Sequence, residues 1–150
     1  MNHDTKLRSL IAPTDEELHQ QLSGLRSREL PQSGSRQVNF TPAEVILCLA
    51  ASTKVKWNSY GGNNAHTAPT PIPELARLFG RSPASVLSKM GNLFGGRTHG
   101  GVSEVEAAEW YFADPARLEA VLVRLLAAAR KVGVNERQLP DFLVRTGGRS

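Results

Sequence analysis

Apolar residues recur at helical spacing in several segments of this chain. The clearest stripe lies between residues 115 and 132, where apolar positions follow the helical period of about 3.6 residues. These positions are Leu118, Val121, Leu122, Leu125, Leu126, Ala129 and Val132. Asp114 precedes the stripe as an N-cap, Pro115 takes the first helical position and Gly133 ends it. The pattern predicts a long helix that forms the backbone of the core.

Three other segments begin with a capping box, in which a serine or threonine stands three residues before a glutamate. The boxes pair Thr14 with Glu17, Thr41 with Glu44 and Ser103 with Glu106. They predict helices that end near residues 25, 54 and 113. A short final helix is predicted at 136–145, whereas the glycines and asparagines of 57–70 predict a loop. The fold class is therefore mainly α.

The segment 70–94 predicts two helices joined by a tight corner. Pro73 opens the first helix and Gly80 closes it, while Ser82 caps the second helix and Pro83 takes its first helical position. This spacing is that of a helix-turn-helix, whose second helix usually lies in the major groove of DNA. We expect this core, winged if the turn RTHGG serves as a wing, to pack on the long C-terminal helix.

The second helix of this pair has two predicted faces. Its apolar residues should face inward: Val86, Leu87, Met90, Leu93 and Phe94. The expected outward set is polar or basic: Arg81, Ser82, Ser85, Ser88, Lys89 and Asn92. This set holds no acid that phosphates would repel, and its side chains suit base edges and phosphates. A helical corner without any ligand remains the structural alternative.

Charge is concentrated around the same segment. The 150-residue chain has a net charge of +4, but residues 54–97 hold six basic residues against one acid, Glu74, so their net charge is +5. A localised positive field is what phosphate binding requires. Lys54 and Lys56 adjoin Trp57 and Tyr60, whose rings suit stacking on bases, although Trp57 could instead fill the core.

The loop after the second helix offers two more candidates, Arg97 and His99, which could reach the DNA backbone or the minor groove. We divide the chain into three regions. Residues 1–39 form an N-terminal arm with a short helix and a linker, either loosely attached or partner-binding. Residues 40–135 form the DNA-binding domain, and residues 136–150 a C-terminal extension or linker.

Several classes of protein are not expected. No apolar run reaches the roughly 18 residues of a membrane helix, and the N-terminus lacks a signal-peptide core, so we expect a cytoplasmic protein. The single cysteine, Cys48, lies in an apolar run and should be buried. No metal site, cofactor site or catalytic motif is evident, so the chain itself is not expected to be an enzyme.

Residues 40–125 resemble the N-terminal region of McrA-like, HNH-type restriction endonucleases, which cut modified DNA. The matching residues are Leu75, Ala76, Gly80, Arg81, Ser82, Pro83, Val86, Lys89, Asn92, Ser103, Trp110, Asp114, Pro115, Arg117 and Leu118. The resemblance implies a module that reads double-stranded DNA, including a modified cytosine, for a C-terminal HNH nuclease domain in a parent chain. None of the four histidines lies in an HNH frame, so this chain should not cut DNA alone.

Two other functions stay open. A winged-helix transcriptional regulator would share the DNA chemistry but would need a homodimer or an effector site, and the apolar helix at 115–132 could supply the dimer seam. A protein-interaction domain would dock its partner through the N-terminal arm. It predicts that charge reversal at Arg81 and Lys89 leaves the main activity intact, whereas DNA binding predicts a loss of affinity.

Overall fold

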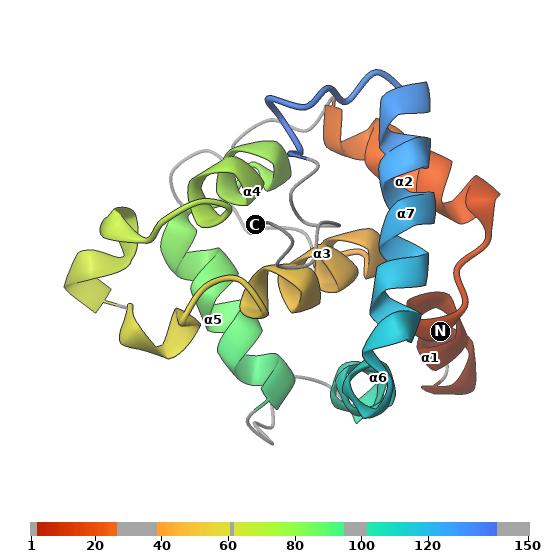
Figure 1. Cartoon of the computed structure of the whole chain (residues 1–150), viewed down its shortest axis with the longest axis horizontal. Coiled ribbons are helices and arrows are strands. Elements are labelled where there is room, and N and C mark those ends of the chain that lie inside the picture. Colours follow the sequence, from red (N-terminus) through yellow and green to blue (C-terminus); the bar gives the residue numbers. More distant parts are fainter. Residues whose placement is uncertain (1–2, 27–38, 61, 95–101, 141–150) are drawn as a thin grey trace.

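The computed structural model describes residues 3–26, 39–60, 62–94 and 102–140, and this part of the chain is mainly helical without strands (Figure 1). The helices are α1 (His3–Ile11), α2 (Asp15–Arg26), α3 (Pro42–Ser52), α4 (Ile72–Phe79), α5 (Pro83–Phe94), α6 (Val102–Ala113) and α7 (Pro115–Lys131). Two 3-10 segments, η1 (Trp57–Ser59) and η2 (Gly62–Thr67), lie between α3 and α4. The predicted class is confirmed for these residues.

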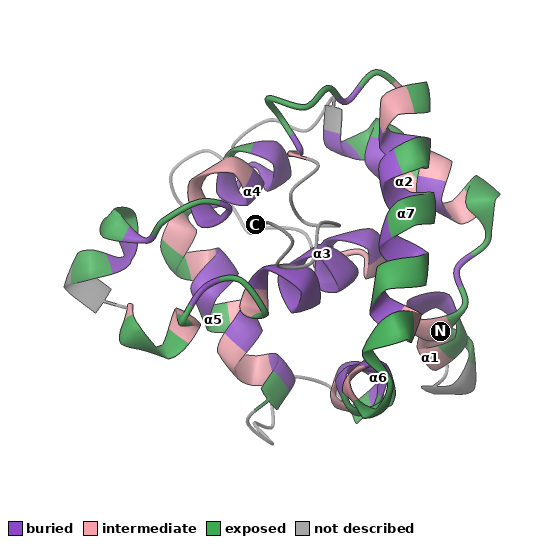
Figure 2. Ribbon diagram, viewed as in Figure 1, coloured by how far each residue is buried: buried purple, intermediate pink, exposed green. Residues whose placement is uncertain are grey.

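Helix α3 lies at the centre of the fold. Its residues from Ala43 to Ala51 are all buried, and it packs against α1, α2, α4, α5 and α7 (Figures 1 and 2). A helix that is hydrophobic on every side has to be enclosed in this way. Cys48 is fully buried as predicted, and burial raises the pKa of its thiol, which keeps it neutral.

Helix α7 matches its prediction closely, but it covers the core rather than forming its centre. Asp114 caps it by accepting a hydrogen bond from the backbone N–H of Ala116, and Gly133 follows it at a φ of 94°. Its predicted apolar stripe is buried except for the half-buried Val132, and it packs on α2, α3 and α6. The dimer seam expected on this stripe is therefore wrong, because the stripe faces the molecule's own core.

The N-terminal arm is integrated into the fold, so its expected loose attachment is wrong. Helix α1, which the sequence analysis did not predict, packs on α6, and α2 packs on α7. The arm contributes four leucines to the common core: Leu10, Leu18, Leu22 and Leu25. The hydroxyl of Tyr111 in α6 donates to the carbonyl of Leu10, which ties the two helices together. Tertiary packing stabilises a short helix such as α1, whose sequence alone gives little signal.

Two of the three predicted capping boxes are confirmed. Thr14 and Glu17 exchange hydrogen bonds at the start of α2, as do Thr41 and Glu44 at the start of α3. The third box is not the start of its helix, because α6 already begins at Val102 and Ser103 is buried within its first turn.

The predicted helix at 136–145 is wrong over its described part, since residues 136–139 form turns and a bend; its remainder lies outside the described residues. The predicted linker at 31–39 lies outside them except for Asn39. None of the helices in the described ranges has the length and apolar character needed to cross a membrane.

Candidate nucleic-acid interface

The corner between α4 and α5 forms as its residues predict. Gly80 adopts a left-handed conformation with φ 67° and ψ 38°, and the backbone N–H of Arg81 donates to the carbonyl of Ala76 at 2.9 Å. Together with the bond from Gly80 to Arg77, this is a Schellman motif. Ser82 then caps α5 by accepting from the backbone N–H of Ser85 at 3.1 Å. These bonds pair backbone groups at the end of α4 and at the start of α5.

Arg81 does not face outward, and its prediction as a DNA contact is wrong. Its side chain is 3% exposed, and its Nε lies 3.2 Å from Oε2 of Glu44, which is completely buried. The guanidinium carbon also stands 3.8 Å from the ring centre of Phe40. A buried carboxylate is very unfavourable without a nearby cation. Arg81 therefore neutralises Glu44 inside the protein and is not available at the surface.

Lys89 is also turned inward, contrary to prediction. Its Nζ lies 2.6 Å from Oε1 of Glu104, and these side chains are 13% and 6% exposed. Its Nζ is also 5.0 Å from the Phe40 ring centre, while Lys6 of α1 reaches the other oxygen of Glu104 at 3.7 Å. Glu104 of α6 therefore neutralises Lys89, the single basic residue of α5.

These residues form one buried group of charges around an aromatic ring. We call it the Phe40 cluster: Phe40, Glu44, Arg81, Lys89 and Glu104. Neither Phe40 nor Glu104 was a predicted site residue, and Glu44 was predicted only as part of a capping box. One signal was available, because an apolar residue directly before an N-cap often packs on its helix.

The outer face of α5 remains polar and without acids. Ser82 and Ser88 are exposed, while Ser85 and Asn92 are half-buried. Ala84 is the other exposed residue in the first turn, so the side chains on this face are small and neutral. The structure thus confirms an outward, acid-free face at Ser82 and Ser88, but the face is not cationic.

The loop before α4 runs beside α5, since both η1 and η2 pack against that helix (Figure 1). Lys54 and Lys56 are exposed, as a DNA contact requires. Trp57 is half-buried and stacks on Phe94 with ring centres 5.6 Å apart and an interplanar angle of 11°. The alternative in which Trp57 serves packing is therefore favoured. Tyr60 is half-buried at the edge of the core, and Arg97 and His99 lie outside the described residues.

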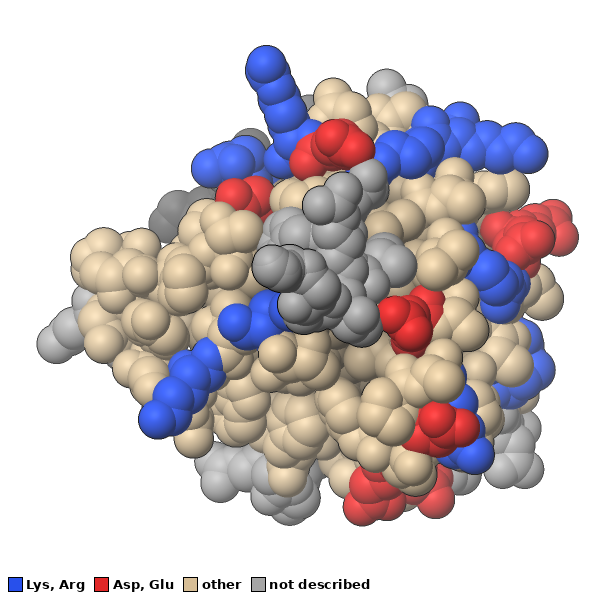
Figure 3. Space-filling view, viewed as in Figure 1, with Lys and Arg blue, Asp and Glu red and all other residues tan. Residues whose placement is uncertain are grey.

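The positive field is weaker than the sequence count suggested, because Arg81 and Lys89 are paired with carboxylates inside the molecule. Lys54, Lys56 and Arg77 are the exposed basic residues of 39–94. Figure 3 shows few charged side chains over the α4–α5 side, whereas most of the acidic ones in this view lie over the side of α2, α6 and α7. An anionic partner would be repelled least on the α4–α5 side.

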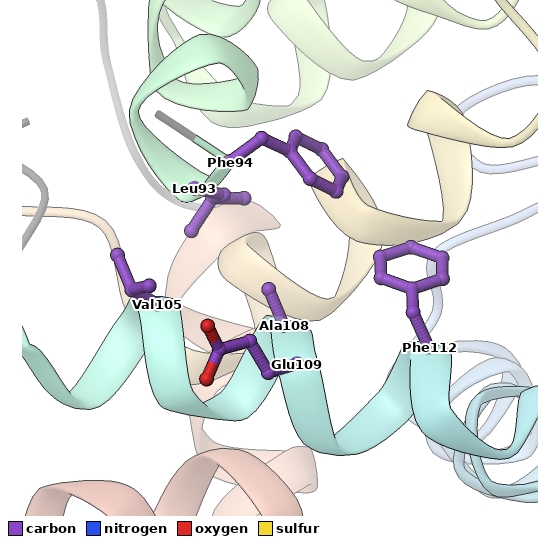
Figure 4. A pocket seen from close by; sticks show the side chains of 6 residues that line it. All are labelled: Leu93, Phe94, Val105, Ala108, Glu109 and Phe112. Atoms are coloured by element: carbon purple, nitrogen blue, oxygen red, sulfur yellow. The ribbon is translucent and has the colours of Figure 1, made fainter. Parts of the chain in front are cut away.

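A second feature, absent from the sequence analysis, is an apolar pocket of about 200 Å³ between the end of α5 and α6 (Figure 4). We call it the Phe94–Phe112 pocket. Its lining residues are Leu93, Phe94, Val105, Ala108, Glu109 and Phe112. Glu109 supplies its single charged group. The residues from α6 follow helical spacing, which a search for outward apolar positions on that helix could have found.

Comparison with known proteins adds no further evidence about this site. No protein-family model, no curated protein and no solved structure matches the chain.

Proposed function

We propose that this chain is a DNA-binding module, in which α4 and α5 act as a helix-turn-helix and the adjoining loop supplies the cations. The observation that carries the proposal is the acid-free outer face of α5 beside the exposed Lys54 and Lys56. The exposed start of α5 at Ser82 adds the partial positive charge of a helix N-terminus, which favours phosphate.

The contact set differs from the one that the sequence suggested. Lys54 and Lys56 contact the phosphates, and small side chains at Ser82, Ser85 and Ser88 allow the helix to approach the duplex closely. Tyr60 and Asn92 lie at the edge of this surface, both half-buried. Arg81 and Lys89 act instead as positioning residues, because their buried pairs hold α5 against α3 and α6.

The resemblance to McrA-like restriction endonucleases supports the same role. Under it, the chain recognises its target without cutting, for an HNH nuclease domain in a longer protein, and a cytoplasmic location fits this role. A preference for modified cytosine belongs to this refinement alone. Equal affinities for plain, methylated and hydroxymethylated duplexes would remove the refinement and leave general DNA binding in place.

The decisive experiment measures duplex binding by fluorescence anisotropy at about 50 and 200 mM salt, a range over which phosphate contacts weaken strongly. In the double variant Lys54→Ala and Lys56→Ala, we expect weaker binding and a salt dependence reduced by about two phosphate contacts. Lys131→Ala, at the exposed end of α7, is the matched control and should bind as the unmodified chain does. Undetectable binding of the unmodified chain at the lower salt concentration would overturn the proposal.

The two alternative functions, a transcriptional regulator and a protein-interaction domain, have less support than the DNA-binding module. The regulator needs a homodimer or an effector site, and the apolar stripe of α7 that could have supplied the dimer seam is covered. A protein-interaction role has one specific observation in its favour, the Phe94–Phe112 pocket, which lies on α5 and α6 rather than on the N-terminal arm.

A further inference from the structure

The Phe94–Phe112 pocket combines aromatic rings with a single carboxylate. The rings of Phe94 and Phe112 have centres 5.5 Å apart and are tilted by 38°. Figure 4 shows Glu109 on the same side of α6 as Val105 and Ala108, with its carboxylate directed into the space below Leu93. A cavity of about 150 Å³ can hold a benzene molecule, so this pocket has room for the head of a large side chain.

The same combination occurs at two other places in this chain, and an arginine occupies both. Arg81 lies over Phe40 and pairs with Glu44. Arg117 lies over Trp110, with its guanidinium carbon 4.3 Å from the ring centre and its Nε 3.9 Å from Oδ2 of Asp114. At the pocket the rings and the carboxylate are present, but no cation of the described residues pairs with Glu109.

The pocket presents apolar surface to solvent. Phe94 is 43% exposed although it lines the pocket. By helical spacing Trp110, the other exposed aromatic side chain of this region, lies on the far side of α6, where Arg117 covers its ring. An exposed aromatic side chain in an apolar pocket is typical of protein-binding surfaces, where arginine is also enriched.

We infer that the Phe94–Phe112 pocket binds an arginine side chain of a partner protein. The guanidinium pairs with the carboxylate of Glu109, and its aliphatic stem packs on Phe94 and Phe112. Arginine fits better than lysine because its planar, weakly hydrated head stacks on rings and meets a carboxylate through two hydrogen bonds. The 5.5 Å between the ring centres leaves no space between the rings, so the arginine side chain lies across their exposed sides. Glu109 would repel the phosphates of DNA, so the pocket is not part of the proposed DNA-binding surface.

The site is tested by NMR on the whole chain, following the Ala108 methyl group and the Phe112 ring. The probe is the peptide acetyl-Leu-Arg-Leu-amide, and the same peptide with citrulline in place of arginine is the uncharged control. We expect saturable shifts with the arginine peptide and about tenfold weaker binding of the citrulline peptide. Glu109→Gln should weaken the arginine peptide by the same factor, whereas Glu119→Gln, at an exposed position of α7, should not.

Three results would overturn the inference. The first is the absence of saturable shifts up to about 50 mM peptide. The second is butylguanidinium binding as tightly as the peptide, which would indicate that the ligand of the pocket is a free small molecule and not a protein. For a protein ligand, the flanking leucines should raise the affinity at least about fivefold. The third is binding of the arginine peptide to the Arg97→Ala variant but not to the unmodified chain. This result would mean that the chain's own Arg97 occupies the pocket. Glu109→Gln should leave duplex affinity unreduced, so this test is independent of the proposed DNA binding.

Discussion

The Phe40 cluster and the loop at 54–60 use the same kinds of residue for opposite purposes. Both hold basic and aromatic residues. In the cluster, Arg81 is buried and the side chain of Lys89 is 13% exposed, and the two lie 3.2 and 2.6 Å from carboxylates. In the loop, Lys54 and Lys56 are exposed. The comparison teaches that basic residues counted along a segment do not give the charge of its surface, because some of them neutralise acids inside the fold.

The positions of the carboxylates explain the difference. Glu44 belongs to the most enclosed helix, α3, so its charge has to be compensated within the core. Glu104 is likewise buried in the first turn of α6. Lys54 directly follows α3 and donates its backbone N–H to the carbonyl of Ala51, but its side chain lies at the surface, as does that of Lys56. The following predictions test this contrast.

The largest effect is expected for Arg81→Ala. It leaves Glu44 buried without its cation and should lower the free energy of unfolding by about 3–5 kcal/mol. Urea denaturation measures this change, and Lys56→Ala, the exposed counterpart, should stay within about 0.5 kcal/mol of the unmodified chain. Replacing both Glu44 and Arg81 by methionine should restore most of the lost stability. If the double variant were as unstable as Arg81→Ala, the loss of packing on Phe40 or of the capping box of Thr41 and Glu44, rather than charge, would explain the result.

A smaller effect is expected for Lys89→Met, which keeps the aliphatic stem and removes the charge. Glu104 would retain only the longer pair with Lys6, so we expect a loss of about 1.5–3 kcal/mol in thermal unfolding. Below its melting temperature the variant should bind duplex DNA within about twofold of the unmodified chain, since Lys89 is not a phosphate contact. A folded Lys89→Met protein that bound as weakly as the Lys54 and Lys56 double variant would break the contrast between the two regions.

The smallest effect is expected for Tyr111→Phe, which removes one neutral buried hydrogen bond and should cost about 1 kcal/mol. Burial raises the pKa of Tyr111, so the folded state favours the neutral phenol. In the unfolded chain a tyrosine ionises near pH 10, and stability is therefore lost as the pH rises above that value. Urea denaturation at about pH 8 and pH 11 should show a smaller alkaline loss for Tyr111→Phe.

Tyr60→Phe is the control for that measurement, because Tyr60 is only half-buried and its variant should keep the alkaline loss. An unchanged alkaline loss in Tyr111→Phe would show that other groups cause it. The loss of unfolding free energy in Tyr111→Phe also gives a reference value. Removing a buried neutral hydrogen bond should cost less than removing either charged pair of the Phe40 cluster.

Features that depend on a few neighbouring residues could be predicted from the sequence. The capping boxes at Thr14 and Thr41 and the left-handed Gly80 follow from local backbone chemistry. The period of α7 also identified its buried face correctly. Helix α1 could not be predicted in this way, since it depends on contacts with α6 that lie about 100 residues away in the chain.

Local sequence patterns specify where most helices begin and end and which side of each is apolar, because capping hydrogen bonds and periodicity act over a few residues. The placement of the charged side chains depends on how distant helices pack. Arg81, just before the N-cap, and Lys89, at helical spacing, were both expected to face outward like Ser88, yet both pair with the buried carboxylates of Glu44 and Glu104. A buried charge requires a partner that the packing of distant helices supplies, and no local pattern specifies that partner.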